Sequence, residues 1–204
     1  MSSSGINYRE TYFDFPELTK IRGEPTSESL FVFKNELKAN AAAALLQLGG
    51  GAHGHIGLIL TRVQYALLAP EPFVRPTFPV SLVIPAGTTT IQATSMRDAH
   101  AEAVRVFREV TGVEKALIQQ LVIAIDGPYL VALRNRQSNS ITGPIAIVLA
   151  HLQDNYGKIT PQVLQAKDDD IMWMSYNPQE PINTFFNAIE DLNELTTIAN
   201  TPMS

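Results

Sequence analysis

The sequence contains no cysteine and no apolar run long enough to cross a membrane. Without cysteine, disulfide scaffolds and cysteine-ligated zinc sites are excluded. The longest apolar stretches, residues 41–48 and 121–125, fall well short of the roughly 20 residues that span a bilayer. The N-terminus has no basic segment followed by an apolar one, so we expect no secretion signal, no membrane partner and a cytoplasmic protein.

Charge is also sparse and unevenly distributed. Charged residues make up 17% of the chain, and a net charge of -5 argues against a protein whose main role is to bind nucleic-acid phosphates. Residues 1–153 carry 13 basic and 12 acidic side chains, whereas residues 154–204 carry 2 and 8. The run Asp168–Asp170 lacks the interleaved spacing and turn glycine of a calcium loop, so we interpret it as a solvated face.

The hydrophobic pattern predicts an all-α fold. Apolar residues recur three and four positions apart over most of the 204 residues, with little sign of strand. Thr26 or Ser27 is expected to cap a helix that runs to Leu48. Thr61 and Gln64 form a capping-box pattern that opens a short helix. Five prolines between positions 70 and 85 then predict a Pro-rich loop, in which only residues 80–84 resemble a strand.

The second half of the chain continues the helical pattern. A helix is expected to begin within residues 88–90, to break at Gly112 and to be followed by another that ends near residue 126. Thr142 is the expected cap of a helix that Gly157 ends. Two more helices should begin at Pro161 and Pro181, which gives seven or eight helices in all.

The loop of residues 49–57 is the stretch most suggestive of catalysis, because it combines glycines with His53 and His55. It matches neither a P-loop, which needs a Lys-Ser or Lys-Thr, nor a dinucleotide loop, which needs a preceding strand. Two histidines alone do not complete a zinc site. We interpret the loop as an inter-helix turn without catalytic, cofactor or metal function, and a metal-dependent enzyme that uses both histidines is an alternative.

Three stretches resemble the Gag polypeptide of copia-type LTR retrotransposons, which is related to retroviral capsid proteins. The first is Leu18–Gly23, an apolar-Thr-Lys-apolar entry before the first long helix. The second is Leu133–Asn135, followed by a helix that ends in Tyr156–Gly157. The third is similar to the turn and helix of the major homology region, and its residues are Gln179, Glu180, Pro181, Phe185, Phe186 and Ile189.

The resemblance covers residues 18–204 and implies a capsid subunit with two helical lobes. Residues 1–25 would be an N-terminal arm, residues 26–157 the first lobe and residues 158–204 the second, which is short for an independent core. Such a protein is not an enzyme. It assembles with itself into virus-like particles, and element RNA is bound by a downstream nucleocapsid module outside this chain. The residues of the third motif are the expected assembly residues, and a domesticated Gag that acts as an adaptor is an alternative.

Overall fold

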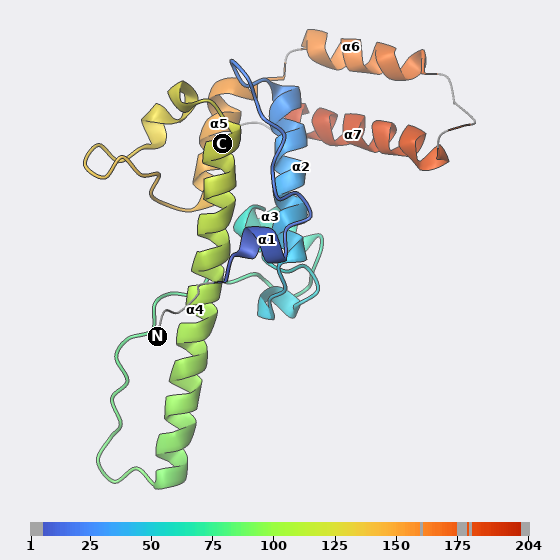
Figure 1. The fold of residues 1–204 in the computed structure, drawn as a ribbon. Helices are drawn as coiled ribbons and strands as arrows, with labels where there is room; N and C mark the ends of the chain where they lie inside the picture. Colours follow the sequence, from blue (N-terminus) through green and yellow to red (C-terminus); the bar gives the residue numbers. More distant parts are fainter. Residues whose placement is uncertain (1–5, 160, 175–178, 180, 201–204) are drawn as a thin grey trace.

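The computed structural model describes residues 6–159, 161–174, 179 and 181–200. Within these residues the chain forms seven α-helices and three short 3₁₀ helices, and no β-strand (Figure 1). The α-helices are α1 (Tyr8–Thr11), α2 (Ser27–Ala43), α3 (Arg62–Ala66), α4 (Thr90–Ala124), α5 (Ile145–Tyr156), α6 (Pro161–Met172) and α7 (Ile182–Asn200), and the 3₁₀ helices are Leu48–Gly50, Ile56–Leu58 and Gly127–Leu133. The all-α prediction is therefore confirmed. None of the described helices is both long and apolar enough to cross a membrane.

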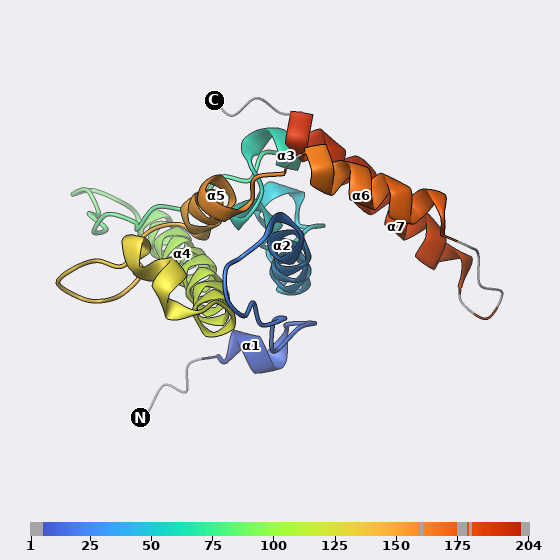
Figure 2. The same ribbon diagram turned by 90° about the horizontal axis from the view of Figure 1, so that it is seen from above.

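The hydrophobic core lies between α2, the C-terminal half of α4 and α5, which are seen end-on in Figure 2. Each helix contributes side chains that are completely buried: Phe33 and Leu37 from α2, Leu117 and Leu121 from α4, and Ile145 and Leu152 from α5. These residues recur at the spacing of a helical stripe, as the sequence predicts. Their burial supplies the main apolar stabilisation of the chain.

The predicted starts of α2, α3 and α4 are confirmed. In each of them the capping side chain bonds to a residue three positions further along the chain. Thr26 accepts a hydrogen bond from the amide of Ser29, whose hydroxyl accepts one from the amide of Thr26. The same reciprocal capping box joins Thr61 to Gln64 at α3. A third box, with Thr89 as the cap, opens α4. These side chains satisfy amide groups that a helix N-terminus leaves without a partner.

The predicted end of α2 is wrong. The helix stops at Ala43 instead of reaching Leu48, because the following loop folds back and binds its last carbonyls. The His55 amide donates to Ala41 O at 2.7 Å, and His55 Nδ1 lies 2.8 Å from Ala44 O. Gly54 permits this return, since a Cβ atom there would lie 2.4–2.9 Å from three carbonyl oxygens.

The prediction that Gly112 breaks a helix is also wrong. The helix α4 is 35 residues long, from Thr90 to Ala124, and it continues through Gly112 without a break. A Cβ atom at Gly112 would lie 2.9 Å from the Tyr8 ring, so the glycine provides room for a side chain from α1. Its role is close packing between two segments that are distant in the sequence.

Thr142 does not cap α5, contrary to the prediction. Pro144 occupies the N-cap position, and the Ile145 amide donates to Glu114 Oε1 at 3.1 Å. The Glu114 side chain is buried and also pairs with Arg75 from the Pro-rich segment. One carboxylate of α4 thus holds both α5 and the Pro-rich segment. The predicted end of α5 at Gly157 is confirmed.

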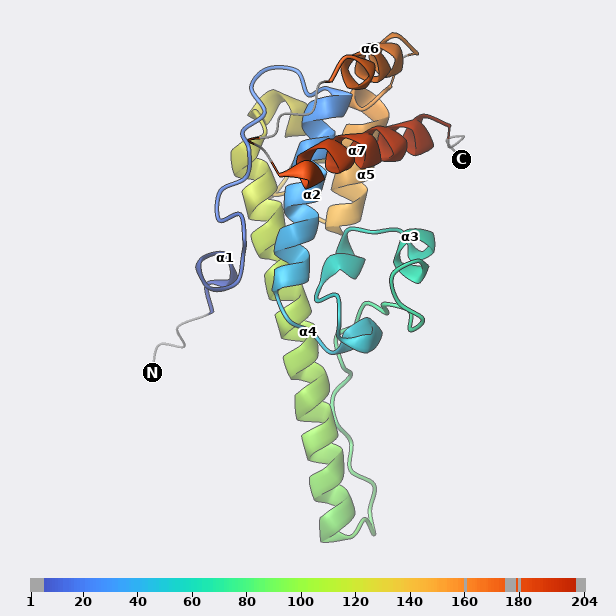
Figure 3. The same cartoon turned by 90° about the vertical axis from the view of Figure 1, so that its right-hand side faces the viewer.

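The Pro-rich segment, residues 70–85, runs along the N-terminal half of α4, and Figure 3 shows both extending away from the core. The rings of Phe78 and Phe107 are in T-shaped contact, with their centroids 5.3 Å apart. His100 Nε2 lies 3.0 Å from Val80 O. Residues 80–84 have no strand partner, so the expected strand is absent from this described segment.

The described part of the predicted N-terminal arm, residues 6–25, is packed against the helices. It contains α1, and its apolar side chains Phe13, Leu18 and Ile21 are buried in the core. The Ile21 amide donates to Ala124 O at 2.9 Å, which ties the segment to the end of α4. The described part of this segment is therefore packed on the core, and two residues of the Leu18–Gly23 motif are core residues.

Candidate functional site

The hairpin of α6 and α7 is the first candidate, because it includes the predicted assembly residues. The two helices lie side by side beside the core helices (Figures 1 and 2). Lys167 Nζ of α6 is 2.6 Å from Glu28 Oε1 at the start of α2. Apolar side chains of both helices and of α2 line a small pocket of about 260 Å³ at this junction.

The structure places the predicted assembly residues at the start of α7. Gln179 and Pro181 are exposed in the turn, and Glu180 lies outside the described residues. Phe185 and Ile189 are half-buried, whereas Phe186 is 53% exposed. The rings of Phe185 and Phe186 meet edge to face at 6.0 Å. The turn and the aromatic pair therefore share one end of the hairpin.

Sequence reasoning did not select the most exposed apolar residues of this hairpin. Trp173, which follows α6, is 84% exposed, and its neighbours Met172 and Met174 are exposed as well. Ile182, the first residue of α7, is also exposed. We call Met172, Trp173, Met174, Ile182 and Phe186 the apolar hairpin surface. Exposed groups of large apolar residues, tryptophan above all, are typical of protein interfaces. The sequence feature that could have identified these residues is the run of three large apolar residues at positions 172–174.

The two histidines of the glycine loop bind backbone carbonyls of different segments. His53 Nε2 lies 3.1 Å from Leu68 O, and His55 Nδ1 bonds to Ala44 O. In the part of the chain that the structure describes, no three His, Asp or Glu side chains gather as metal ligands would. The loop is the inter-helix turn that the sequence indicates, and its histidines help to close the end of α2.

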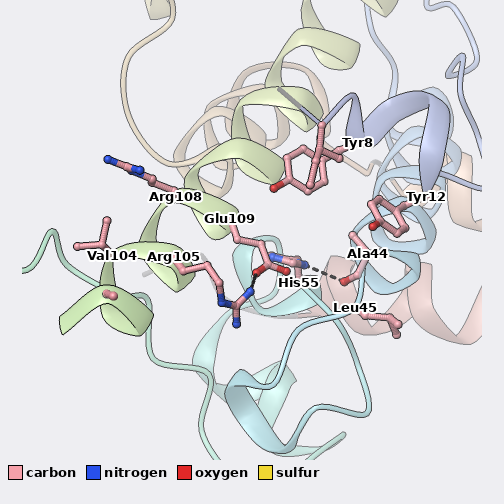
Figure 4. A pocket seen from close by; sticks show the side chains of 11 residues that line it. Tyr8, Tyr12, Ala44, Leu45, His55, Val104, Arg105, Arg108 and Glu109 are labelled. Carbon is pink, nitrogen blue, oxygen red and sulfur yellow. Dashed lines mark hydrogen bonds and ion pairs between the residues drawn. The ribbon is translucent and has the colours of Figure 1, made fainter. Parts of the chain in front are cut away.

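A second candidate is a pocket of about 560 Å³ between α1, the end of α2 and the middle of α4 (Figure 4). Tyr8 of α1 and Tyr12, which follows α1, lie on one side, and Arg105, Arg108 and Glu109 of α4 on the other. His55 closes the inner end and is completely buried. Its residues come from three distant segments, so no local sequence pattern predicts this pocket.

Burial governs the electrostatics of this pocket. It lowers the pKa of the His55 imidazole, although the Ala44 carbonyl and Glu109 partly oppose the shift. Burial also raises the pKa of the Tyr8 phenol, and Glu109 adds to that effect. At neutral pH the pocket therefore presents a neutral imidazole and a neutral phenol.

Comparison of the chain with protein-family models, curated proteins and solved structures gave no match in any of the three.

Proposed function

We propose that this protein is the capsid subunit of a copia-type Gag, a structural protein that assembles with itself and has no enzymatic activity. Residues 26–157 form its first lobe and residues 158–204 its second, with residues 158–160 as the linker. Element RNA is enclosed in the cytoplasm through a downstream nucleocapsid module. Support comes from the three Gag-like stretches, in their family order, and from the helical fold.

The observation that carries the proposal is the apolar hairpin surface. Trp173 and Met172 are 84% and 73% exposed, although each is large enough to contribute to a core. A buried apolar side chain contributes about 1.5–3 kcal/mol relative to an exposed one, and in the proposed capsid a second copy of the chain covers this surface. A contact between unlike surfaces repeats around a ring, and many weak contacts hold a shell together.

Light scattering and negative-stain microscopy at rising concentration and ionic strength test this proposal. We expect the wild-type chain to form rings, tubes or shells. Trp173→Ala should shift their onset to at least about tenfold higher concentration, since truncation of an interface tryptophan costs 2 kcal/mol or more. Leu67→Ala is the matched control, because Leu67 is also 84% exposed but lies next to α3.

Persistently monomeric wild-type protein under all these conditions would contradict assembly by this chain and favour the adaptor alternative. Equal loss of assembly in Trp173→Ala and Leu67→Ala would show that the hairpin has no special role. The proposal requires that assembly is weakened in Trp173→Ala and unchanged in Leu67→Ala.

A further inference from the structure

An open groove lies between the C-terminal half of α4 and the loop of residues 134–141. Its volume is about 410 Å³. Its apolar lining consists of Ile118, Val122, Ile123 and Ile141, and the Ile123 side chain is 57% exposed. Large apolar side chains that gather on an open surface are typical of places where another molecule packs. We call these residues, with Lys115 and Arg134, the α4 groove.

The charged side chains that line the α4 groove are both cationic. Lys115 is exposed, and Arg134 is half-buried and donates to Asn139 O at 2.9 Å. Within the described residues, no salt bridge involves either cation. Asp126, the only acidic residue between positions 115 and 141, pairs with Arg22 instead. The α4 groove therefore favours a partner that combines an apolar surface with negative charge.

The hairpin of α6 and α7 has this combination. Residues 161–200 contain seven acidic side chains and one basic side chain, Lys167, which pairs with Glu28. Asp169 is exposed and lies one helical turn before Trp173, whose amide donates to Asp169 O at 3.0 Å. Residues four apart on a helix lie on the same face. A free carboxylate group and the exposed indole are therefore neighbours on the hairpin.

The α4 groove and the hairpin lie on opposite sides of the molecule, with α2 between them (Figures 1 and 2). The hairpin of one chain is held at its own α2 by Lys167 and Glu28, so it does not reach the groove of the same chain. Between two copies, the two surfaces can meet. A pair joined in this way keeps one free groove and one free hairpin, so the contact can repeat into a ring or a longer assembly.

We propose that the α4 groove is the docking site for the hairpin of a second copy of this chain. Trp173 of the second copy packs on Ile118 and Val122, and its acidic run at residues 168–170 lies beside Lys115 and Arg134. This inference rests on the proposed assembly, and it names the surface that covers the apolar hairpin surface.

Charge reversal in the full chain tests the contact. Lys115→Glu should raise the concentration at which light scattering detects assembly at least about tenfold, because it places like charges across the contact. Arg97→Glu is the matched control, since Arg97 is also an exposed cation of α4 but lies outside the groove. It should change this concentration less than about twofold. Equal effects of the two variants would overturn the proposal.

A second reversal on the hairpin should restore the contact. Asp169→Lys in the Lys115→Glu background exchanges the two charges, so assembly should begin within about threefold of the wild-type concentration. Asp154→Lys in the same background changes an exposed acidic residue of α5 and should restore nothing. Equal rescue by both substitutions would mean that net charge alone governs assembly, which would contradict the docking site.

A mixture of two variants that each lack one surface isolates a single contact. Trp173→Ala retains the groove, and Lys115→Glu retains Trp173, the only tryptophan of the chain. Together they should form a one-to-one complex in sedimentation, and the Trp173 emission should move to shorter wavelengths. The double variant Trp173→Ala/Lys115→Glu, used in place of Trp173→Ala, should abolish both effects. Pairing that persists without an intact groove rules out the site.

The outcomes separate the α4 groove from the assembly itself. Wild-type particles that form equally well in Lys115→Glu overturn the groove alone and leave the proposed function standing. Wild-type protein that stays monomeric overturns both.

Discussion

The core of α2, α4 and α5 and the hairpin of α6 and α7 differ in how much of their large apolar side chains is exposed. In the core, Leu37, Leu117 and Leu152 are completely buried. On the hairpin, Met172, Trp173 and Phe186 remain exposed, although they are as large. Burial stabilises a large apolar side chain in either region, but of these two sets of residues only the core set has an intramolecular partner that covers it.

The largest effect should come from the core. Leu117→Ala removes a completely buried side chain and should lower the free energy of unfolding by about 3–4 kcal/mol. Ile123→Ala, on an exposed position of the same helix, should cost less than about 1 kcal/mol. Urea unfolding followed by circular dichroism measures both, and similar losses would contradict the assignment of the core.

The next effect concerns the loop that ends α2. Gly54→Ala should destabilise the protein by about 3 kcal/mol, since it combines a left-handed backbone with a clash against three carbonyl oxygens. Gly87→Ala has a similar positive φ but open space around it, and it should cost about 1 kcal/mol. Equal midpoints of urea unfolding for the two variants would show that the loop does not close tightly on α2.

A smaller effect is expected from pH. Burial lowers the pKa of His55 below its ordinary value of 6.5, so the unfolded chain binds more protons than the folded chain between the two values. The contribution of His55 to stability is complete above about pH 6.5 and falls as the pH drops toward the lower folded pKa. Urea unfolding between pH 5 and 7.5 should show a shallower decline in His55→Gln than in the wild type, and identical slopes would disprove the argument.

The smallest effect on stability is expected on the hairpin. Trp173→Ala should change the free energy of unfolding by no more than about 0.5 kcal/mol, because the side chain is 84% exposed in the single chain. Urea unfolding at concentrations below assembly measures this value. A loss of several kcal/mol would mean that Trp173 packs within its own chain, and would remove the contrast between the two regions.

The sequence predicts those features of the fold that depend on neighbouring residues. The helices capped by Thr26, Thr61 and Thr89 begin where the pattern indicates, and the capping box predicted at Thr61 is present, since each capping bond spans three residues. The predictions that failed depend on distant partners. Gly112 lies within α4 and makes room there for the ring of Tyr8, and α5 begins without Thr142 because Glu114 binds its first amide.

The candidate sites divide in the same way. The stretch at the start of α7 that resembles Gag can be identified from the sequence alone. The aromatic pair of Phe185 and Phe186 lies in this stretch. The pocket between α1 and α4 cannot be predicted in this way, because His55, Glu109 and Tyr8 meet only when three segments fold together. In the sequence, His55 is a candidate metal ligand because His53 lies two residues away. In the structure, the acidic side chain that interacts electrostatically with His55 is Glu109.

Intrinsic fluorescence tests the central claim most directly, because Trp173 is the only tryptophan in the chain. Its emission should be that of a solvated indole at low concentration and should move to shorter wavelengths at the concentration where light scattering detects assembly. That coincidence is the result that an intermolecular cover for the hairpin predicts. Assembled protein that keeps the emission of a solvated indole would contradict it.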